Sequence, residues 1–341
     1  MGQVNDILDE VRSDIAANDK VLKEARKRRD LVAKKAAAFP GVLRQYSSGS
    51  VAHGTVNNPV NDADDGIVLD RRTYPDLGPE GDEKEGPNEI VEEIREFVSP
   101  KIRKVYPDAV VTTSKRGLLV RFSSPLHDQD PTVDIIVTLT RKDGSGLWIP
   151  NLETKSWDAS HPEKHTELFI GGTESLRALR ARVIRLVKAL NKQWSEPALT
   201  SFNVEALAWE SIDDSSLSLE DALTEFFTYA ESEVRKRNTK DPAGVSANLK
   251  LLVTRKVTVK RLKAAAANLR CALAAQENEG DNDVQEAMAK VFRDYVDAPS
   301  GSKADWAALL RKGNEGVSAT VGGLALSTGH SLKTTRAFGG Q

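Results

Sequence analysis

Three aspartates stand within short segments that have the apolar composition of β-strands. Asp62 and Asp64 lead into Ile67-Val68-Leu69, and Asp134 lies inside the apolar run of residues 133–139. Side chains two residues apart in a strand point to the same face, so Asp62 and Asp64 project together. A carboxylate in the middle of a core-like strand is costly unless it has a partner. If the two strands are neighbours, the three carboxylates converge on one face of a sheet.

Converging carboxylates repel each other, and a divalent cation with a preference for hard oxygen ligands relieves that repulsion. Three such groups are enough to hold two Mg²⁺ ions, with Mn²⁺ as the alternative. One ion would lower the pKa of an attacking hydroxyl, and the other would hold a triphosphate and its leaving pyrophosphate. Asp62, Asp64 and Asp134 are therefore the predicted catalytic and metal-binding residues.

A phosphate-binding turn is predicted just before the first aspartates. Gly49 and Ser50 precede a short helical segment, where backbone N–H groups and a hydroxyl favour an anion. The spacing of Gly49 and Gly54 matches a P-loop, but Thr55 stands where a P-loop needs lysine, which argues against an ordinary ATPase. A calcium loop over the acidic segment also fits poorly, because its glycine is one place early. The remaining alternative for each motif alone is an acidic or glycine-bounded turn without function.

The order of predicted elements gives an α+β fold with a mixed sheet in the front half and helices behind it. Hydrophobic periodicity predicts one long helix over residues 4–39, strands over 118–122 and 132–140 as antiparallel neighbours, and an irregular segment over 141–161. Further helices are predicted over 88–105, 174–194, 202–210, 219–237 and 243–276. The last residues, 318–341, are rich in Gly, Ser and Thr and are expected to form a flexible tail. His161 and His165 are expected to be a pair at the surface.

Composition limits the classes of partner. The formal net charge is −2, so no overall positive field favours stable binding to nucleic acid. No apolar run approaches the ~20 residues that span a bilayer, and the amino terminus lacks the basic-then-apolar pattern of a signal peptide. We therefore expect a cytoplasmic protein without a membrane partner.

The combination of Gly49-Ser50, the turn ending Gly54-Thr55, and Asp62-x-Asp64 resembles the DNA-polymerase-β-like nucleotidyltransferases. The form Asp62-Ala63-Asp64-Asp65-Gly66-Ile67-Val68-Leu69 is similar to the bacterial cGAS/DncV-like nucleotidyltransferases, or CD-NTases, of CBASS anti-phage systems. The resemblance implies a catalytic lobe over residues 1–165, with a spine helix over 1–39, and a helical lobe over 166–317 that completes the cleft. It also implies synthesis of a cyclic di- or trinucleotide from ATP, GTP or both, whose effector needs no direct contact with the enzyme.

The same resemblance assigns nucleotide-binding roles in the second half. Lys188 and Ser201 fall where the family contacts the donor triphosphate, and Phe202 falls where an aromatic side chain stacks on a base. A lysine is a point charge for phosphate, and stacking contributes roughly 1–3 kcal/mol per base. Without the resemblance, the alternatives are a solvated helix lysine for Lys188 and a core aromatic for Phe202.

Two alternatives to this function and one further partner remain open. The chain is alternatively an enzyme of the same superfamily that adds nucleotides to RNA or protein, or an inactive nucleotide-binding scaffold. The end of the chain, Ala337-Phe338-Gly339-Gly340, resembles a tail that a ubiquitin-like conjugating enzyme activates, although Gln341 follows the glycines. The alternative for this segment is an end without a role.

Overall fold

A mixed β-sheet stands at the centre of the computed structural model, which describes residues 2–302. Within that range its seven strands follow the order β1-β2-β5-β4-β3, and β6 pairs with β5 and β7. β2 and β5 are parallel, and the other pairs are antiparallel. The strands are β1 (Val42–Ser48), β2 (Asp62–Leu69), β3 (Val110–Ser114), β4 (Gly117–Arg121), β5 (Thr132–Thr140), β6 (Leu147–Asn151) and β7 (Ser156–Ser160). The predicted antiparallel pairing of β4 with β5 is confirmed.

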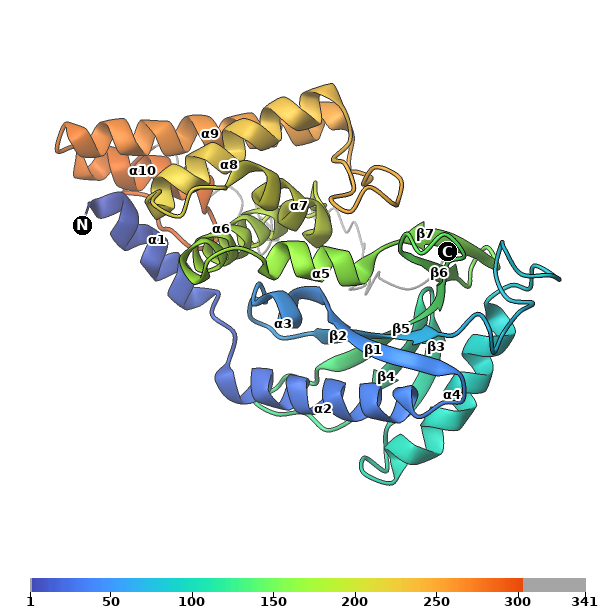
Figure 1. Ribbon diagram of the computed structural model, residues 1–341. Helices are drawn as coiled ribbons and strands as arrows, with labels where there is room; N and C mark the ends of the chain where they lie inside the picture. The colour runs from blue at the N-terminus through green and yellow to red at the C-terminus, as the bar shows by residue number, and fades with distance from the viewer. Residues whose placement is uncertain (1, 303–341) are drawn as a thin grey trace, which may run out of the picture.

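Helices lie on both sides of this sheet (Figure 1). The described helices are α1 (Gln3–Asp14), α2 (Asp19–Ala37), α3 (Gly49–His53), α4 (Asn88–Arg103), α5 (Pro162–Ile170), α6 (Glu174–Lys192), α7 (Ser201–Ser211), α8 (Leu219–Lys236), α9 (Arg255–Glu277) and α10 (Asp281–Val291). The predicted α+β class with a mixed sheet and a helical second half is confirmed. The predicted tail over 318–341, including Ala337–Gly340, lies outside the described residues.

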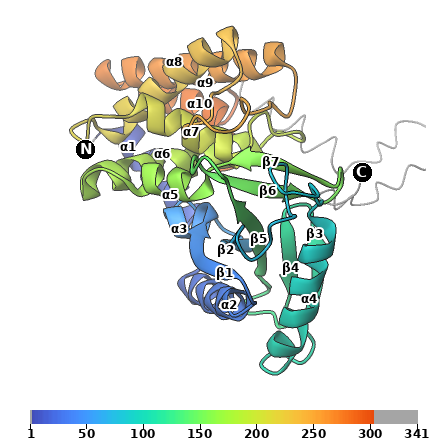
Figure 2. The same cartoon turned by 45° about the vertical axis from the view of Figure 1, so that its right-hand side comes forward.

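α2 and α4 cover one face of the sheet, with α2 below the strands in Figure 1 and α4 to their right in Figure 2. On that face the alternate residues Ile67 of β2 and Ile135 of β5 are buried against Val32 of α2 and Ile94 of α4. Because side chains alternate along a strand, burying these residues turns Asp64 and Asp134 toward the opposite face. The packing of α2 and α4 thus decides which face of the sheet carries the acidic groups.

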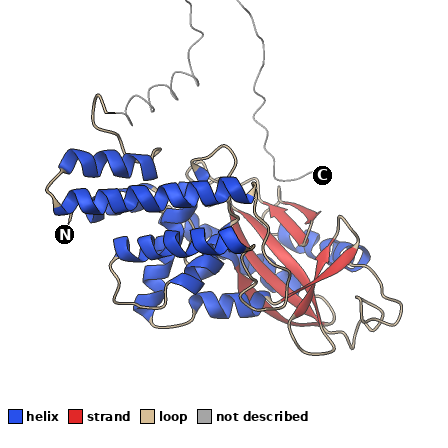
Figure 3. Ribbon diagram, turned by 90° about the horizontal axis from the view of Figure 1, so that it is seen from above, coloured by secondary structure: helices blue, strands red, loops and turns tan. Residues whose placement is uncertain are grey.

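A second core fills the helical half of the chain, which lies beyond the other face of the sheet and is seen from above in Figure 3. It joins α6 to α10 and also includes Val4, Leu8 and Val11 of α1. The amino-terminal helix therefore packs with elements that follow it by more than a hundred residues. The two cores leave the sheet and the helical half facing each other across the region that holds the aspartates.

The prediction of one continuous spine helix over residues 4–39 is wrong. The helix is interrupted between Asp14 and Asp19, because the Asn18 side chain accepts hydrogen bonds from the backbone N–H groups of Lys20 and Val21 and so starts a second helix. The carbonyl of Ile15 at the break accepts a hydrogen bond from the backbone N–H of Asn58. As a result, α1 packs into the core of the helical half, and α2 packs against the sheet.

Three other segments differ from prediction. Residues 141–161, predicted to be irregular, contain the β6–β7 hairpin, and α5 begins directly after it. The helix predicted over 243–276 begins only at Arg255, because residues 241–250 form a loop held by the Asp241 carboxylate, which accepts hydrogen bonds from the N–H groups of Val245 and Ser246. His165 is buried rather than at the surface.

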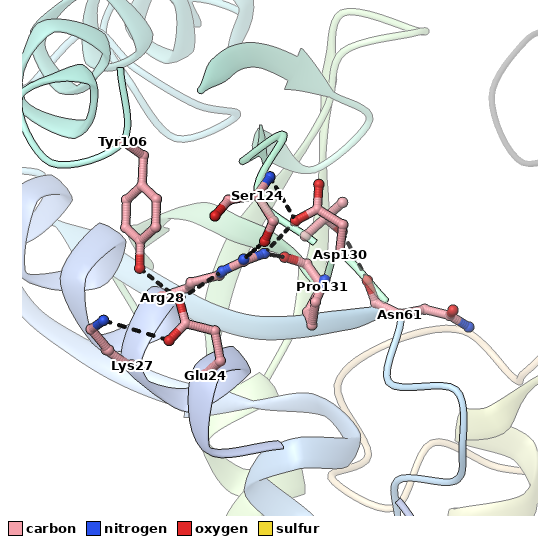
Figure 4. A network of polar contacts seen from close by, with 9 residues as sticks. Glu24, Lys27, Arg28, Asn61, Tyr106, Ser124, Asp130 and Pro131 are labelled. Carbon is pink, nitrogen blue, oxygen red and sulfur yellow. Dashed lines mark hydrogen bonds and ion pairs between the residues drawn. The ribbon is translucent and has the colours of Figure 1, made fainter. Parts of the chain in front are cut away.

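A buried arginine ties α2 to the segment that enters β5 (Figure 4). The side chain of Arg28 is 1% exposed. It donates to the Asp130 carboxylate at 2.6 Å and to the carbonyl oxygens of Pro131 and Ser124. Its guanidinium also lies 4.6 Å from the centre of the Phe122 ring. Since β5 starts two residues after Asp130, Arg28 fixes the position from which Asp134 is presented.

Among the described residues, no helix is both long and apolar enough to cross a membrane.

Candidate active site

The strand register places two of the predicted catalytic aspartates side by side. Asp64 of β2 pairs with Asp134 of β5 in the parallel ladder, and Asp62 lies one pleat before Asp64 on the same face. Adjacent strands in a sheet are about 4.8 Å apart. All three carboxylates therefore lie on one face, as the sequence predicted, with Asp62 exposed and the other two half-buried.

Crowding changes the protonation of these groups. Burial, together with the neighbouring carboxylates Asp62 and Asp134, raises the pKa of Asp64 to about 8. Burial and Asp62 raise the pKa of Asp134 to about 6. Each shift means that the charged form lacks sufficient compensation in the protein alone. Among residues 2–302, no three acidic, His or Cys side chains already converge at the spacing of a metal site. The three carboxylates lie on one face of the sheet and are close enough to shift one another's pKa values, but they do not converge on one metal position.

Gly49 packs directly on this acidic face. Its backbone has φ of 73°, and a Cβ atom at this position would lie 1.9 Å from Oδ2 of Asp64. Only glycine combines that backbone conformation with so close an approach. Gly49, the first residue of α3, therefore brings its backbone against the Asp64 carboxylate.

A cleft of about 1040 Å³ runs between this face of the sheet and the helical half. Its walls include seven of the eight predicted site residues, which come from β1–α3, β2, α6 and α7: Gly49, Ser50, Asp62, Asp64, Lys188, Ser201 and Phe202. The eighth, Asp134, is the strand neighbour of Asp64. The structure therefore brings the predicted residues together, and their roles stay predictions.

Lys188 is neither solvated nor free in the cleft. Its ammonium lies 2.7 Å from Glu205 Oε1 and 3.1 Å from the Thr55 hydroxyl. The Thr55 hydroxyl also donates to Glu205 Oε1 at 2.7 Å, and the His53 ring bonds to Oε2 of the same carboxylate. Burial would raise the pKa of Glu205, but Lys188 and His53 outweigh it and lower the pKa to about 2. The charged Glu205 carboxylate therefore links α7 to Lys188 of α6, to His53 of α3 and to Thr55 in the turn that follows α3.

Phe202 is half-buried, beside the buried His165 at a ring-centre distance of 4.7 Å. His165 hydrogen-bonds to Asp241, the residue that also holds the loop of residues 241–250 against the cleft. Burial lowers the pKa of His165 despite this acidic partner. The Phe202 ring therefore packs on one side against His165, which Asp241 holds in place, and borders the cleft on the other.

Sequence reasoning missed Glu205, His53, His165 and Asp241. One signal was available for Glu205, since it is an acidic residue in the apolar helix Asn203-Val204-Glu205-Ala206-Leu207, which is the same anomaly that identified Asp134. His165 and Asp241 are 76 residues apart, and their pairing has no local signal.

No protein-family model matches the sequence, and no curated protein matches it either. Solved structures do match. CdnC of E. coli MS115-1, in its structure with ATP, has a TM-score of 0.64 and 16% sequence identity over 86% of this chain and 98% of CdnC. The CD-NTase CdnG of Bradyrhizobium diazoefficiens, in complex with GTP, has a TM-score of 0.61 and 12% identity over 90% of this chain and 98% of CdnG. This chain has the CD-NTase fold.

The CD-NTase fold extends to a third structure. The DncV cyclic AMP-GMP synthase of Vibrio cholerae, in complex with the linear intermediate pppA(3′,5′)pG, has a TM-score of 0.52 and 13% identity over 86% of this chain and 87% of DncV. The resemblance in the motifs around Ser50 and Asp64 is therefore confirmed at the level of the CD-NTase fold, including the mixed sheet and the helical half.

Proposed function

We propose that this protein is a metal-dependent nucleotidyltransferase that joins nucleoside triphosphates into a cyclic di- or trinucleotide. The observation that carries the proposal is that Asp64, which lines the cleft together with Lys188, pairs in the strand register with Asp134. A hydroxyl of one nucleotide attacks the α-phosphate of another, a phosphorus–oxygen bond forms, and pyrophosphate leaves. A further round of the same reaction closes the ring.

The donor set suits Mg²⁺ or Mn²⁺. Carboxylate oxygens are the ligands these ions prefer, and the raised pKa values of Asp64 and Asp134 mark a site that lacks positive charge. Asp62 and Asp64 would hold both ions, and Asp134 would hold the ion nearest the attacking hydroxyl. Divalent cations at such a site favour ionisation of the hydroxyl and neutralise charge on the leaving pyrophosphate.

The other cleft residues position the substrate. The backbone of Gly49 lies against Asp64, and Ser50 lines the same cleft. The Ser50 hydroxyl and the backbone N–H groups next to Gly49 would donate to phosphate oxygens. Ser201 at the start of α7 and the ammonium of Lys188 would contact the triphosphate from the opposite wall. Phe202 would stack on the base of the donor nucleotide, because its ring borders the cleft and is held by His165. Catalysis then consists mainly of positioning and charge neutralisation.

The resemblance of the Asp62–Leu69 segment to the CD-NTases of CBASS systems extends the proposal to anti-phage defence, with the cyclic product as the signal. ATP and GTP are the proposed substrates.

The test is incubation of the purified protein with all four nucleoside triphosphates and Mg²⁺ or Mn²⁺, followed by nuclease mapping and mass spectrometry. Cyclic products with release of pyrophosphate are expected. Extension of added RNA without cyclic products would assign the chain to the RNA-modifying alternative, and nucleotide binding without any pyrophosphate release would contradict an enzymatic role.

A further inference from the structure

The loop of residues 241–250 forms a section of the cleft wall that the proposed chemistry does not use. Six consecutive residues of this loop, 245–250, line the cleft. The segment lies between α8 and α9 and contains no helix or strand. We call residues 241–250 the cleft loop. Because it lacks the repeating hydrogen bonds of a helix or a sheet, its shape depends on contacts made by particular side chains.

Asp241 supplies such contacts at the start of the cleft loop. Its side chain is 1% exposed. Oδ2 accepts hydrogen bonds from the N–H groups of Val245 at 2.9 Å and Ser246 at 2.7 Å. Burial would raise the pKa of Asp241, but the N–H groups of the loop and the His165 ring outweigh it and lower that pKa. Asp241 therefore stays charged and holds the backbone of the loop in one turn.

The other carboxylate oxygen of Asp241 binds His165 of α5. An ionised carboxylate only accepts hydrogen bonds, so Nε2 of His165 carries the proton and the ring is fixed in one tautomer. His165 in turn packs edge to face with Phe202, with ring centres 4.7 Å apart and ring planes inclined by 60°. One buried carboxylate thus connects the cleft loop to an aromatic ring that lines the same cleft.

The far end of the cleft loop is tied to the helix that carries Phe202. The Asn203 side chain, which is fully buried in the first turn of α7, donates to the carbonyl of Lys250 at 2.8 Å. The N–H of Leu249 donates to the carbonyl of Thr239 at 2.8 Å, which joins the two ends of the loop. Both ends of the cleft loop are therefore held in a fixed relation to Phe202.

We propose that Asp241 is a positioning residue for the nucleotide base, which acts by holding His165 and the cleft loop so that the Phe202 ring keeps the orientation in which it stacks. This role deepens the proposed function and rests on it, since it concerns how the same cleft binds a base. The residues proposed to contact phosphate lie elsewhere, in α3, in α6 and at the first position of α7. Asp241 should therefore contribute to binding of the base and not to binding of the triphosphate.

The test compares two probes in the presence of Mg²⁺ and needs no turnover. The α,β-methylene analogue of ATP has both a base and phosphates, whereas inorganic tripolyphosphate has only the phosphates. The variant is Asp241→Asn, whose NH₂ group replaces one of the two oxygens that accept from His165 and from the loop. Affinity for the nucleotide should fall at least about tenfold, within the contribution of one base stack, while affinity for tripolyphosphate changes less than about twofold.

Asp214→Asn is the matched control. Asp214 also holds a loop with its carboxylate, which accepts a hydrogen bond from the N–H of Ser216 at 2.8 Å. It is exposed, and its loop, directly before α8, is not part of the cleft wall. The control should keep both affinities at the wild-type value.

A double-mutant cycle shows whether Asp241 acts through the aromatic ring. Phe202→Ala removes the ring and should itself weaken nucleotide binding. If Asp241 positions that ring, adding Asp241→Asn to Phe202→Ala should weaken binding by less than about a further threefold, instead of the tenfold or more expected for Asp241→Asn alone. Losses that multiply in full would mean that Asp241 acts independently of Phe202 and would overturn the inference.

His165→Gln is the second variant, in case Asp241→Asn lowers the unfolding temperature. Its amide keeps an N–H donor for Asp241, so the cleft loop stays held, but the ring beside Phe202 is lost. We expect the same selective loss of nucleotide affinity.

Three outcomes separate the possible failures. Equal losses for nucleotide and tripolyphosphate in both variants would mean that Asp241 and His165 only support the fold. Wild-type affinities in both variants would overturn the positioning role and leave the proposed function standing. A wild-type protein that binds no nucleotide would contradict the proposed function and the positioning role with it.

Discussion

The ammonium of Lys188 lies 2.7 Å from Oε1 of Glu205, with both side chains less than a tenth exposed. This pair joins α6 to α7, and through Thr55 and His53 it also reaches the turn that follows Ser50. Lys188, proposed to meet the triphosphate, is thus held from behind by a carboxylate. The Lys188 ammonium is therefore held in a fixed place at the cleft wall before any nucleotide binds.

Glu205→Gln should destabilise the protein by about 3 kcal/mol, because the substitution leaves the Lys188 charge buried without its counter-charge. Denaturant unfolding followed by circular dichroism measures this. The double variant Lys188→Met, Glu205→Leu should recover most of the loss, since replacing both partners by apolar groups removes the uncompensated charge. A Glu205→Gln variant as stable as wild type would show that the Lys188 charge does not depend on Glu205 as its counter-charge.

Asp64→Asn should abolish synthesis without weakening the metal-free fold. Asp64 is crowded by Asp62 and Asp134, so removing its charge relieves repulsion, and the free energy of unfolding should stay equal or rise. Mn²⁺ should raise the unfolding temperature of wild type, because an ion that binds only the folded state stabilises it. The variant should lose most of that increase, whereas Asp108→Asn, in the exposed segment before β3, should keep it. An equal Mn²⁺ effect in all three proteins would count against a metal site here.

Two glycines at either end of α3 provide a matched pair. Gly49 and Gly54 both have positive φ, but only Gly49 faces Asp64 at a distance that no Cβ tolerates. Gly54→Ala should cost about 1–2 kcal/mol from backbone strain and should keep substantial activity. Gly49→Ala should cost more and should lower the rate at least about tenfold, because it displaces a proposed metal ligand. Similar rates for the two variants would contradict the close approach.

Arg28→Met should destabilise the protein by about 3 kcal/mol, since Glu24 and Asp130 would lose their buried partner. The exposed Arg26, two residues earlier on α2, gives the control, and Arg26→Met should change stability by less than about 0.5 kcal/mol. Thermal or denaturant unfolding of the two variants side by side decides the matter. Comparable stability of both would mean that Arg28 does not anchor the entry to β5.

The acidic face could be predicted because its information is local. Strand alternation places Asp62 and Asp64 together, and the apolar residues around Asp134 mark a strand. The parallel pairing of those two strands then brings Asp134 beside Asp64. The break after Asp14 could not be found in the same way, because Ala16-Ala17 continues a helical composition and only the Asn18 cap interrupts it.

The missed features depend on contacts between distant segments. The β6–β7 hairpin has Pro150 within a strand and glycines before it, which are features of a loop, so its strands are defined by pairing with β5 and with each other. The loop of residues 241–250 contains Pro242 and Gly244, which disfavour a helix, and the Asp241 carboxylate binds its backbone N–H groups and His165. Tertiary contacts overrode local propensity in the hairpin.

The most direct test of the central claim compares Asp134→Asn with Asp128→Asn, an exposed loop residue shortly before β5 in the same chain. Pyrophosphate release and cyclic product are measured with ATP, GTP and Mn²⁺. If aspartates from β2 and β5 act on one reaction, Asp134→Asn loses at least about a hundredfold in rate with its fold intact, and Asp128→Asn matches wild type. Full activity in Asp134→Asn would contradict the account.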